Sequence, residues 1–264
     1  MLPSHVIYDP TGNVTALVED SFDVADQPAV AYAIQQAHPE VEQVGFVHEP
    51  RYDEAPADVT LRMAGGEFCG NATMCAAVWW ARRHGGDEVH VHASGAPEPV
   101  RVSVRHEGDG SYACSVRMPY ALSFDDVELT HMDMSGILPL VRLEGISHLV
   151  VAPGSGFFDL LCRCGEAEHA VRRWCAELGT DGLGLMFLDG SGPTRRLIPL
   201  VYVPGAGTCF WERSCASGSA CVGMWLAHEE DAAIDVDLVQ PGGTLHVTCD
   251  PTARQAWLSG HVRV

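Results

Sequence analysis

Two cysteines occupy matching places in a sequence that repeats part of itself. Residues 68–81 align without gaps on residues 214–227, so that Cys69 meets Cys215. Two matched cysteines, a matched tryptophan and a matched alanine in one register indicate an internal duplication. The further matches are Cys75 with Cys221, Trp79 with Trp225 and Ala81 with Ala227.

Each leading cysteine stands where a helix is expected to begin. Small or polar residues at 70–73 and at 216–219 lead into apolar stretches, a pattern typical of a helix start. Unpaired N–H groups and the helix dipole favour an anion there, so we expect the pKa of both thiols to be lowered. Cys69 and Cys215 are therefore the candidate catalytic residues.

Two thiols on opposite sides of one cleft suit a particular reaction. A thiolate removes a proton from one face of a carbon, and a thiol returns a proton to the other face, which inverts the centre. The natural substrate is an α-amino acid, whose carboxylate would accept hydrogen bonds from the two helix starts. The backbone N–H groups expected to hold it belong to Gly70, Asn71, Ser217, Gly218 and Ser219.

The other cysteines are expected to be structural. The chain has ten cysteines but no Cys-x-x-Cys pair, so the sequence indicates neither a zinc site nor any other metal site. No glycine-rich string follows a strand and opens a long helix, so we expect no cofactor. Cys75 and Cys221 are predicted core residues, and the remaining apolar fillers are Cys114, Cys162, Cys164, Cys175 and Cys249.

The elements around the cysteines also repeat, which predicts an α/β (α+β) fold of two pseudo-symmetric halves. We expect helices at 28–37, 71–84, 166–178 and 217–228, with short strands between them. The polar stretch 121–136 is the expected join. We therefore assign residues 1–124 to an N-terminal half and residues 125–264 to a C-terminal half, with the active site in the cleft between them. The C-terminal tail could pack with the first half.

The charge balance excludes several kinds of partner. Thirty-five Asp and Glu against 16 Lys and Arg give a formal charge of −19, which disfavours nucleic acid and anionic membrane surfaces. The negative electrostatic field of such a chain attracts a small cationic molecule. A net charge that serves only solubility, with no charged partner, explains the composition equally well. No stretch is apolar enough to span a membrane and no leader is evident, so we expect a cytoplasmic protein with reduced thiols.

At these motifs the sequence resembles the diaminopimelate epimerase family of amino-acid racemases that need no pyridoxal phosphate. Within that family, it is most similar to the histidine racemases of staphylopine-type metallophore pathways. The resemblance implies a diaminopimelate epimerase-like fold, each half a mixed or antiparallel sheet wrapped on a central helix, and the two-thiol mechanism. The motifs that carry it are Gly12-Asn13, Glu42-Gln43-Val44-Gly45-Phe46, Glu67-Phe68-Cys69-Gly70-Asn71-Ala72, Ser147-His148, Trp211-Glu212-Arg213-Ser214-Cys215-Ala216-Ser217-Gly218 and Gln240-Pro241-Gly242-Gly243.

By the same resemblance, Asn13, Glu42 and Glu212 are expected to contact the substrate. The sequence departs from the family at Ala216, where glycine is usual and where a methyl group would crowd the carboxylate or restrict the loop. The second departure is the position of Glu212-Arg213, immediately before the second cysteine motif. Diaminopimelate enzymes carry Glu-Arg well upstream, so specificity for diaminopimelate is not expected.

Acidic residues dominate the remaining candidates for substrate binding. Glu67 and Asp181 join Glu42 and Glu212, and carboxylates beside a cleft favour a cationic side chain. Histidine and 2,4-diaminobutyrate are the leading substrates, followed by ornithine and lysine. His148 either orients a catalytic group or is a satisfied core histidine.

Three other activities compete with a histidine or diaminobutyrate racemase. One is a diaminopimelate-type epimerase for another amino acid, and a second is an isomerase of the phenazine-biosynthesis type, which works without the cysteine pair. The third is a non-catalytic protein that binds basic amino acids. A homodimer is compatible with each of them.

Overall fold

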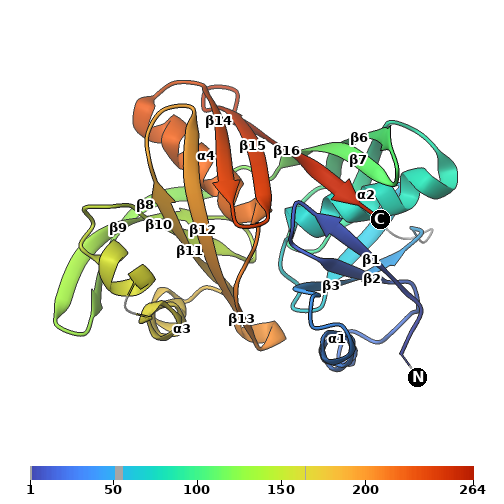
Figure 1. Cartoon of the computed structure of the whole chain (residues 1–264), viewed down its shortest axis with the longest axis horizontal. Coiled ribbons are helices and arrows are strands. Elements are labelled where there is room, and N and C mark those ends of the chain that lie inside the picture. The colour runs from blue at the N-terminus through green and yellow to red at the C-terminus, as the bar shows by residue number, and fades with distance from the viewer. Residues whose placement is uncertain (1, 51–55, 164) are drawn as a thin grey trace.

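The computed structural model describes residues 2–50, 56–163 and 165–264. One continuous sheet of 16 strands carries four α-helices in the described chain (Figure 1). The helices are α1 (Gln27–Ala37), α2 (Gly70–His84), α3 (Ala167–Leu178) and α4 (Ala216–Glu230). The strands are β1 (His5–Pro10), β2 (Thr15–Val18), β3 (Gln43–His48), β4 (Val59–Met63), β5 (Glu88–Ala93), β6 (Val100–Gly108), β7 (Ser111–Met118), β8 (Ser123–His131), β9 (Met134–Arg142), β10 (Ser147–Val151), β11 (Leu183–Asp189), β12 (Thr194–Val203), β13 (Thr208–Trp211), β14 (Ile234–Gln240), β15 (Gly243–Asp250) and β16 (Gln255–Arg263).

The N-terminal half is a closed barrel of eight strands around a central helix. Strands β1 to β7 follow one another in order, and β16 closes the barrel by pairing with both β7 and β1. Helix α2 packs inside against strands on all sides, because its residues from 70 to 79 are buried apolar or small side chains. Helix α1 packs outside, against β3.

The C-terminal half repeats this arrangement. Its strands lie side by side in the order β9, β10, β11, β12, β14, β15, β16. Adjacent strands in this series pair in the same order of parallel and antiparallel directions as β1 to β7. In both halves the pairs are antiparallel, parallel, antiparallel, parallel, antiparallel and antiparallel. Helix α4 packs against β14, β15 and β16, with α3 against β11 and β12. The internal repeat predicted from the cysteine motifs is confirmed by this topology.

The expected join is not an irregular linker. Residues 121–136 contain β8 and the first residues of β9, which form an antiparallel hairpin. From residue 126 to residue 131 of β8, exposed residues alternate with more buried ones, so the polar composition there reflects one solvated strand face. The boundary expected between residues 124 and 125 falls inside β8. Strand β16 extends from the C-terminal half into the N-terminal barrel (Figure 1).

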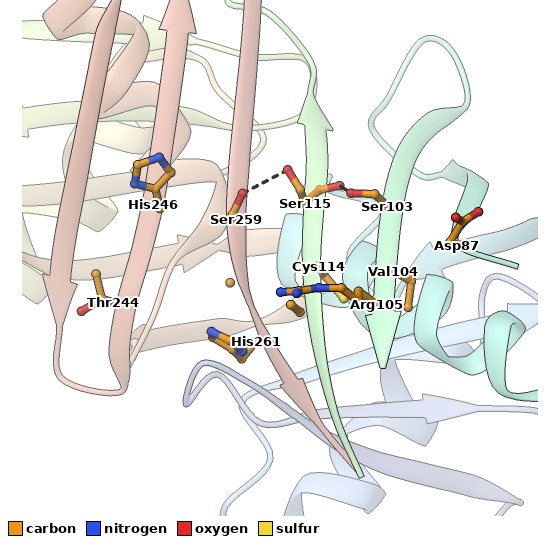
Figure 2. A pocket seen from close by; sticks show the side chains of 12 residues that line it. Asp87, Ser103, Val104, Arg105, Cys114, Ser115, Thr244, His246, Ser259 and His261 are labelled. Atoms are coloured by element: carbon orange, nitrogen blue, oxygen red, sulfur yellow. Dashed lines mark hydrogen bonds between the residues drawn. The ribbon is translucent and has the colours of Figure 1, made fainter. Parts of the chain in front are cut away.

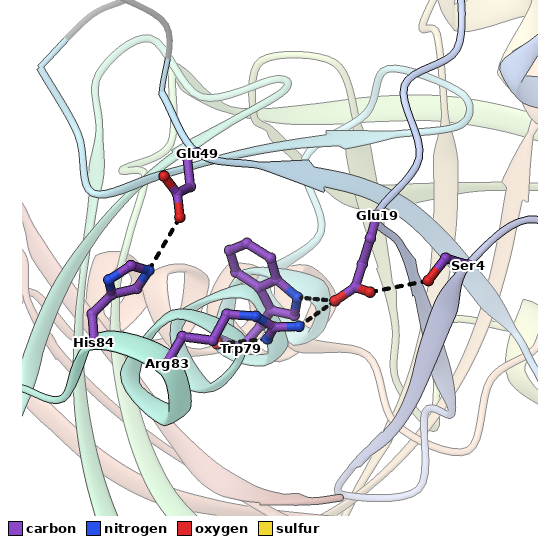
Figure 3. Close-up of polar contacts among 6 residues, drawn as sticks. All are labelled: Ser4, Glu19, Glu49, Trp79, Arg83 and His84. Atoms are coloured by element: carbon purple, nitrogen blue, oxygen red, sulfur yellow. Dashed lines mark hydrogen bonds and ion pairs between the residues drawn. The ribbon is translucent and has the colours of Figure 1, made fainter.

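The end of α2 farthest from Cys69 is fastened to the first strands of the chain. The Glu19 carboxylate accepts hydrogen bonds from the Trp79 indole at 2.7 Å, from the Ser4 hydroxyl at 3.2 Å and from the Arg83 guanidinium (Figure 3). The Arg83 cation also stacks over the Trp79 ring at 4.1 Å. These contacts fix the helix along its axis, and His84 adds an ion pair to Glu49 at 3.3 Å.

The second cysteine of each motif lies in the core. Cys75 and Cys221 are fully buried one and a half turns into α2 and α4, as predicted. Cys114, Cys175 and Cys249 are buried too, whereas Cys162 is half-buried, and Cys164 lies outside the described residues. Within the part of the chain that the structure describes, no helix combines the length and apolar character needed to cross a bilayer.

Candidate active site

Cys69 and Cys215 cap the first turns of the two central helices in the same way. Both have extended backbone angles, with φ of −129° and −125° and ψ of 108° in each case. The sulfur of Cys69 accepts from the Ala72 N–H at 3.5 Å, and that of Cys215 from the Gly218 N–H at 3.4 Å. Extended angles with a capping acceptor are typical of a helix N-cap, so the predicted helix starts are confirmed.

The two helix starts meet each other directly. A methyl group built on Gly70 would lie 2.8 Å from the Cβ of Ala216, so glycine is needed at position 70 because alanine occupies position 216. The Asn71 amide nitrogen donates to the Ser214 carbonyl at 3.0 Å, which links α2 to the loop before α4. The methyl of Ala216 thus fills space against the facing helix.

Both thiols line one cavity between the halves. Asn13, Glu67, Asn71, Glu212, Ala216 and Ser217, all predicted from the sequence, line it with them. Its free volume is about 20 Å³, room for a water molecule and far below the size of an amino acid. The residues that the predictions missed are Gln43, Phe68, Ile146, Val201 and Val203.

A wider groove adjoins this cavity. It has a volume of about 480 Å³ and shares Gln43 and Glu67 with the cavity. Residues of α1 form one wall, and residues 206–210, from the end of a short 3₁₀ helix into β13, form the other. Figure 1 shows α1 and β13 facing each other across the boundary between the halves.

Three carboxylates lie close together around the cavity. Glu212 accepts from the Gln43 amide at 2.7 Å and lies within hydrogen-bonding reach of the Cys215 thiol. Glu42 does not line the cavity but accepts from the Asn13 amide at 2.7 Å, and it lines the groove. Glu67 lines both spaces. Gln43 was missed although it follows Glu42 directly, because a neutral amide carries no charge signal.

The expectation of lowered thiol pKa values is wrong. Burial raises the pKa of Cys69 and of Cys215, and the Glu212 carboxylate raises both further. The helix N–H groups of Ala72 and Gly218 lower the thiol pKa values, as expected, but the increase caused by burial is larger. Burial likewise raises the pKa of Glu212 to about 8, with the Glu42 charge adding to it.

Three buried acceptor atoms at the cavity have no hydrogen-bond partner among the described residues. They are the side-chain oxygens Asn13 Oδ1, Asn71 Oδ1 and Glu67 Oε2, on residues no more than 9% exposed. The amide nitrogens of Asn13 and Asn71 donate to Glu42 and to the Ser214 carbonyl, and these bonds fix the orientation of the amides. The amide oxygens are therefore the groups that remain unpaired. Buried acceptors are normally satisfied, so this side of the cavity calls for an N–H donor.

The helix N–H groups do not all remain available for a carboxylate. The Ser219 N–H donates to the Cys215 carbonyl at 3.0 Å, so Ser219 is withdrawn from the expected set. The Gly218 N–H is held by the Cys215 sulfur, and the Asn71 N–H also acts on the Cys69 sulfur, which leaves Gly70 and Ser217 from that set. Gln240, missed by the sequence analysis, supports this loop by accepting from the Cys215 N–H at 2.8 Å.

Besides Glu42, four predicted site residues lie outside the cavity lining: Gly70, Gly218, His148 and Asp181. His148 is fully buried behind Ser217, and burial lowers its pKa to about 3, so its imidazole is neutral. Asp181 is exposed and interacts with Cys175 on the outer helix α3. Asp181 follows the turn that ends α3 and is not among the residues that line the cavity with the thiols.

A contact between two glycines joins the halves beside the site. A methyl group built on Gly12 would lie 2.4 Å from the Cα of Gly242, and Gly12 has a φ of +93°. The Gly242 N–H donates to the Arg213 carbonyl at 2.7 Å. This contact fixes the position of Asn13 relative to the loop that carries Cys215.

A larger groove of about 790 Å³ lies away from the thiols, on the outer faces of β6, β7, β15 and β16 (Figure 2). Figure 2 shows Ser259 hydrogen-bonded to Ser115 in its floor, at 3.0 Å. Arg105, His246 and His261 surround this floor on exposed strand surfaces. The groove includes no residue predicted from the sequence to act in the site.

The buried Glu212 and His148 give opposite pH dependences of stability. Glu212 keeps a proton that the unfolded chain loses above its ordinary pKa of 4.5, so stability falls as pH rises from 4.5 towards 8. His148 stays neutral while the unfolded chain is protonated below 6.5, so stability falls as pH drops from 6.5 towards 3. The maximum is therefore expected between pH 4.5 and 6.5.

Denaturant unfolding at pH 6.5 and at pH 8 tests the contribution of Glu212 to this pH dependence of stability. The wild type is expected to lose about 2 kcal/mol of unfolding free energy over that interval from Glu212. Glu212→Gln should remove most of that loss, because its amide does not titrate. Equal losses in the two proteins would contradict the assignment.

Comparisons with known proteins agree with this architecture. Residues 4–264 match the family model described as the histidine racemase CntK N-terminal domain. A histidine racemase of Staphylococcus aureus is 30% identical over 97% of this chain and 92% of its own length. A histidine racemase of Fusobacterium nucleatum is 28% identical over 90% of this chain and 85% of its own length.

Solved structures with the same fold are much more distant in sequence. A probable proline racemase from Agrobacterium radiobacter superposes with a TM-score of 0.69 at 13% identity, covering 98% of this chain and 89% of its own. A predicted epimerase from Pseudomonas aeruginosa gives 0.65 at 16% identity, covering 98% and 95%. The fold is therefore a mixed α+β racemase and epimerase fold, and the match over residues 4–264 shows that the chain belongs to the histidine racemase family.

Proposed function

We propose that the protein is a cofactor-independent racemase that interconverts the enantiomers of histidine. The observation that carries this proposal is the pair of cysteine-capped helix starts, which line one cavity from the two halves. One sulfur takes the α-proton as a thiolate while the other, as a thiol, delivers a proton to the opposite face. The proposal includes the finer assignment of a diaminopimelate epimerase-like fold.

The polar atoms of the cavity divide between the two charged groups of an amino acid. The first-turn N–H groups of Gly70 and Ser217 suit the α-carboxylate, whose negative charge grows as the α-proton leaves. The unpaired oxygens of Asn13, Asn71 and Glu67 suit the α-ammonium, which brings three N–H donors. An α-amino acid thus satisfies donors and acceptors that the protein leaves unpaired.

The acidic wall favours a substrate with a second nitrogen. Glu67 and Gln43 lie where the cavity opens into the groove, and Glu42 lines that groove. An imidazole pointing this way would find acceptors for its N–H groups. The relatives named histidine racemase favour histidine over 2,4-diaminobutyrate, which stays the second candidate.

Substrate entry requires the halves to separate. The closed cavity of about 20 Å³ is too small for histidine, so the groove between α1 and β13 must widen before binding. In this proposal the two halves act as domains that close on the substrate and expel water. Closure strengthens the interactions of the carboxylate with the helix N–H groups. The thiols need a reducing compartment, which supports a location in the cytoplasm.

The test is a panel of L-amino acids incubated with the enzyme in D₂O under reducing conditions. The panel holds histidine, 2,4-diaminobutyrate, ornithine, lysine and diaminopimelate. Loss of the α-proton is followed by NMR, and the product is analysed by chiral chromatography. We expect exchange with inversion for histidine. Tight binding with no exchange would instead identify a binding protein, and inversion of another amino acid alone would overturn the substrate assignment.

A further inference from the structure

The hairpin formed by β12 and β13 breaks the pseudo-symmetry of the two halves. In the N-terminal half, six residues, 64–69, connect β4 to α2, and none of these described residues forms a strand. In the C-terminal half, twelve residues, 204–215, connect β12 to α4, and they include β13, which pairs with the end of β12. The thiols and the helix starts are therefore repeated, whereas the hairpin belongs to one half.

Inversion at one carbon makes different demands on repeated and unrepeated elements. The two thiols must reach opposite faces of the α-carbon, and a matched pair of helix starts suits that task. The side chain of an amino acid leaves the α-carbon in one direction only, so its contacts need no counterpart on the other side. We therefore expect the side chain to be recognised by an element that one half alone contains.

The hairpin supplies apolar surface to the cavity. Val201 and Val203 alternate along β12, are at most 7% exposed, and both line the cavity with the thiols. Tyr202, between them, faces the other way and lies under the Arg172 guanidinium at 4.7 Å. Residues 206–210, which run into β13 at the boundary between the halves (Figure 1), form a wall of the groove. The hairpin thus lines both the cavity and the groove.

The tip of the hairpin covers a buried carboxylate of the N-terminal half. A methyl group built on Gly65 would lie 2.5 Å from Glu67 Oε2. The same methyl group would lie 3.0 Å from a methyl carbon of Val203 and 3.2 Å from Ala206 Cβ, so the oxygen and both apolar groups surround one point. Glu67 is only 9% exposed, and its Oε2 has no hydrogen-bond partner among the described residues. The hairpin therefore places apolar groups beside an acceptor that still needs a donor.

This pairing of apolar and acidic surfaces suits a planar ring that carries nitrogen at its edge. An imidazole has two apolar faces, which pack on methyl groups, and an N–H at its edge, for which Glu67 and Gln43 offer acceptors. A linear ammonium group is compact and strongly hydrated, so it loses water beside the valines and gains no hydrogen bond from them. The apolar wall therefore disfavours a linear amine more than it disfavours histidine.

We infer that Val201 and Val203 are specificity-determining residues, which select an imidazole ring over a linear side chain that ends in an ammonium group. The inference rests on the proposed function, because it concerns the side chain of the substrate that the two thiols act on. The acidic residues do not make this choice alone, since a carboxylate accepts from an imidazole N–H and from an ammonium group alike. The choice belongs to the hairpin, which the symmetric catalytic pair does not include.

The test compares two ligands in Val203→Thr, which replaces one methyl group by a hydroxyl and keeps the shape of the side chain. Racemisation of histidine gives KM, and competition by 2,4-diaminobutyrate gives an inhibition constant, whether or not the diamine is itself racemised. We expect KM for histidine to rise about tenfold, as for other small changes in an apolar pocket, while the inhibition constant of the diamine stays level or falls. Val201→Thr should act in the same direction. Neither constant depends on the fraction of folded enzyme, so partial unfolding does not imitate this result.

Tyr202→Phe is the matched control, because Tyr202 lies on the same strand but is not among the residues that line the cavity or the groove. Both constants should stay within about twofold of the wild type in this variant. The inference is overturned if KM for histidine is unchanged in Val203→Thr, if both constants rise together, or if the diamine fails to inhibit that variant.

Equilibrium dialysis with labelled histidine keeps this test separate from the proposed function. If the wild type binds histidine but racemises no amino acid, the proposed function is refuted. Displacement of the bound histidine by 2,4-diaminobutyrate, in the wild type and in Val203→Thr, then still measures the selectivity of the hairpin. A wild type that binds neither amino acid refutes both the function and the inference.

Discussion

Replacing Cys69 or Cys215 by alanine is expected to lower histidine racemisation by at least about a thousandfold in kcat. Each variant keeps a base or an acid at only one face of the α-carbon, so proton removal and delivery can no longer be coupled across it. The measurement is the initial rate of formation of the opposite enantiomer, followed by chiral chromatography from both directions under reducing conditions.

The double variant separates this explanation from a structural one. Because the two thiols act as a unit, removing both should cost little more than removing either. Cys175→Ser is the matched control: that sulfur donates to the Thr180 carbonyl at 3.1 Å beneath α3, and a hydroxyl can replace it. Normal turnover in either single variant of the cavity pair would refute the two-thiol mechanism.

The second large effect is expected from Gly12→Ala. The new methyl group would meet the backbone of Gly242, which cannot move aside as a side chain could, and the φ of +93° adds strain of about 1–3 kcal/mol. The loop must therefore shift, and Asn13 shifts with it. Since a displacement of about 1 Å can cost a hundredfold in rate, we expect kcat/KM to fall about a hundredfold.

Gly205→Ala provides the control for this prediction. Position 205 also lies between the halves, but a methyl group there would come no closer than 3.4 Å to another atom. Its kcat/KM should stay within about twofold of the wild type. A Gly12→Ala protein with wild-type kcat/KM would show that the contact between the glycines does not position the site.

Local features of the fold could be predicted from the sequence because short segments encode them. The small residues after each cysteine predicted the starts of α2 and α4. The repeat of 68–81 at 214–227 predicted the pseudo-symmetry. For the helix starts, residues within one turn carry the signal, and for the repeat a single ungapped match between two short segments carries it.

Other features depend on distant parts of the chain and could not be predicted. The charged residues of β8 are typical of a linker as much as of a solvated strand, and only pairing with β9 distinguishes the two. The raised pKa values of the cysteines follow from burial between the halves, which outweighs the local effect of the helix start. Gln240 supports Cys215 from 25 residues away, and its motif, quoted above for the resemblance, does not by itself indicate this contact.

The last strand has a consequence for any attempt to divide the chain. Strand β16 pairs with both β1 and β7, so the N-terminal barrel is closed by a strand that the C-terminal half supplies. A protein cut between the two repeats would therefore expose the unpaired edges of β1 and β7, and such edges favour aggregation.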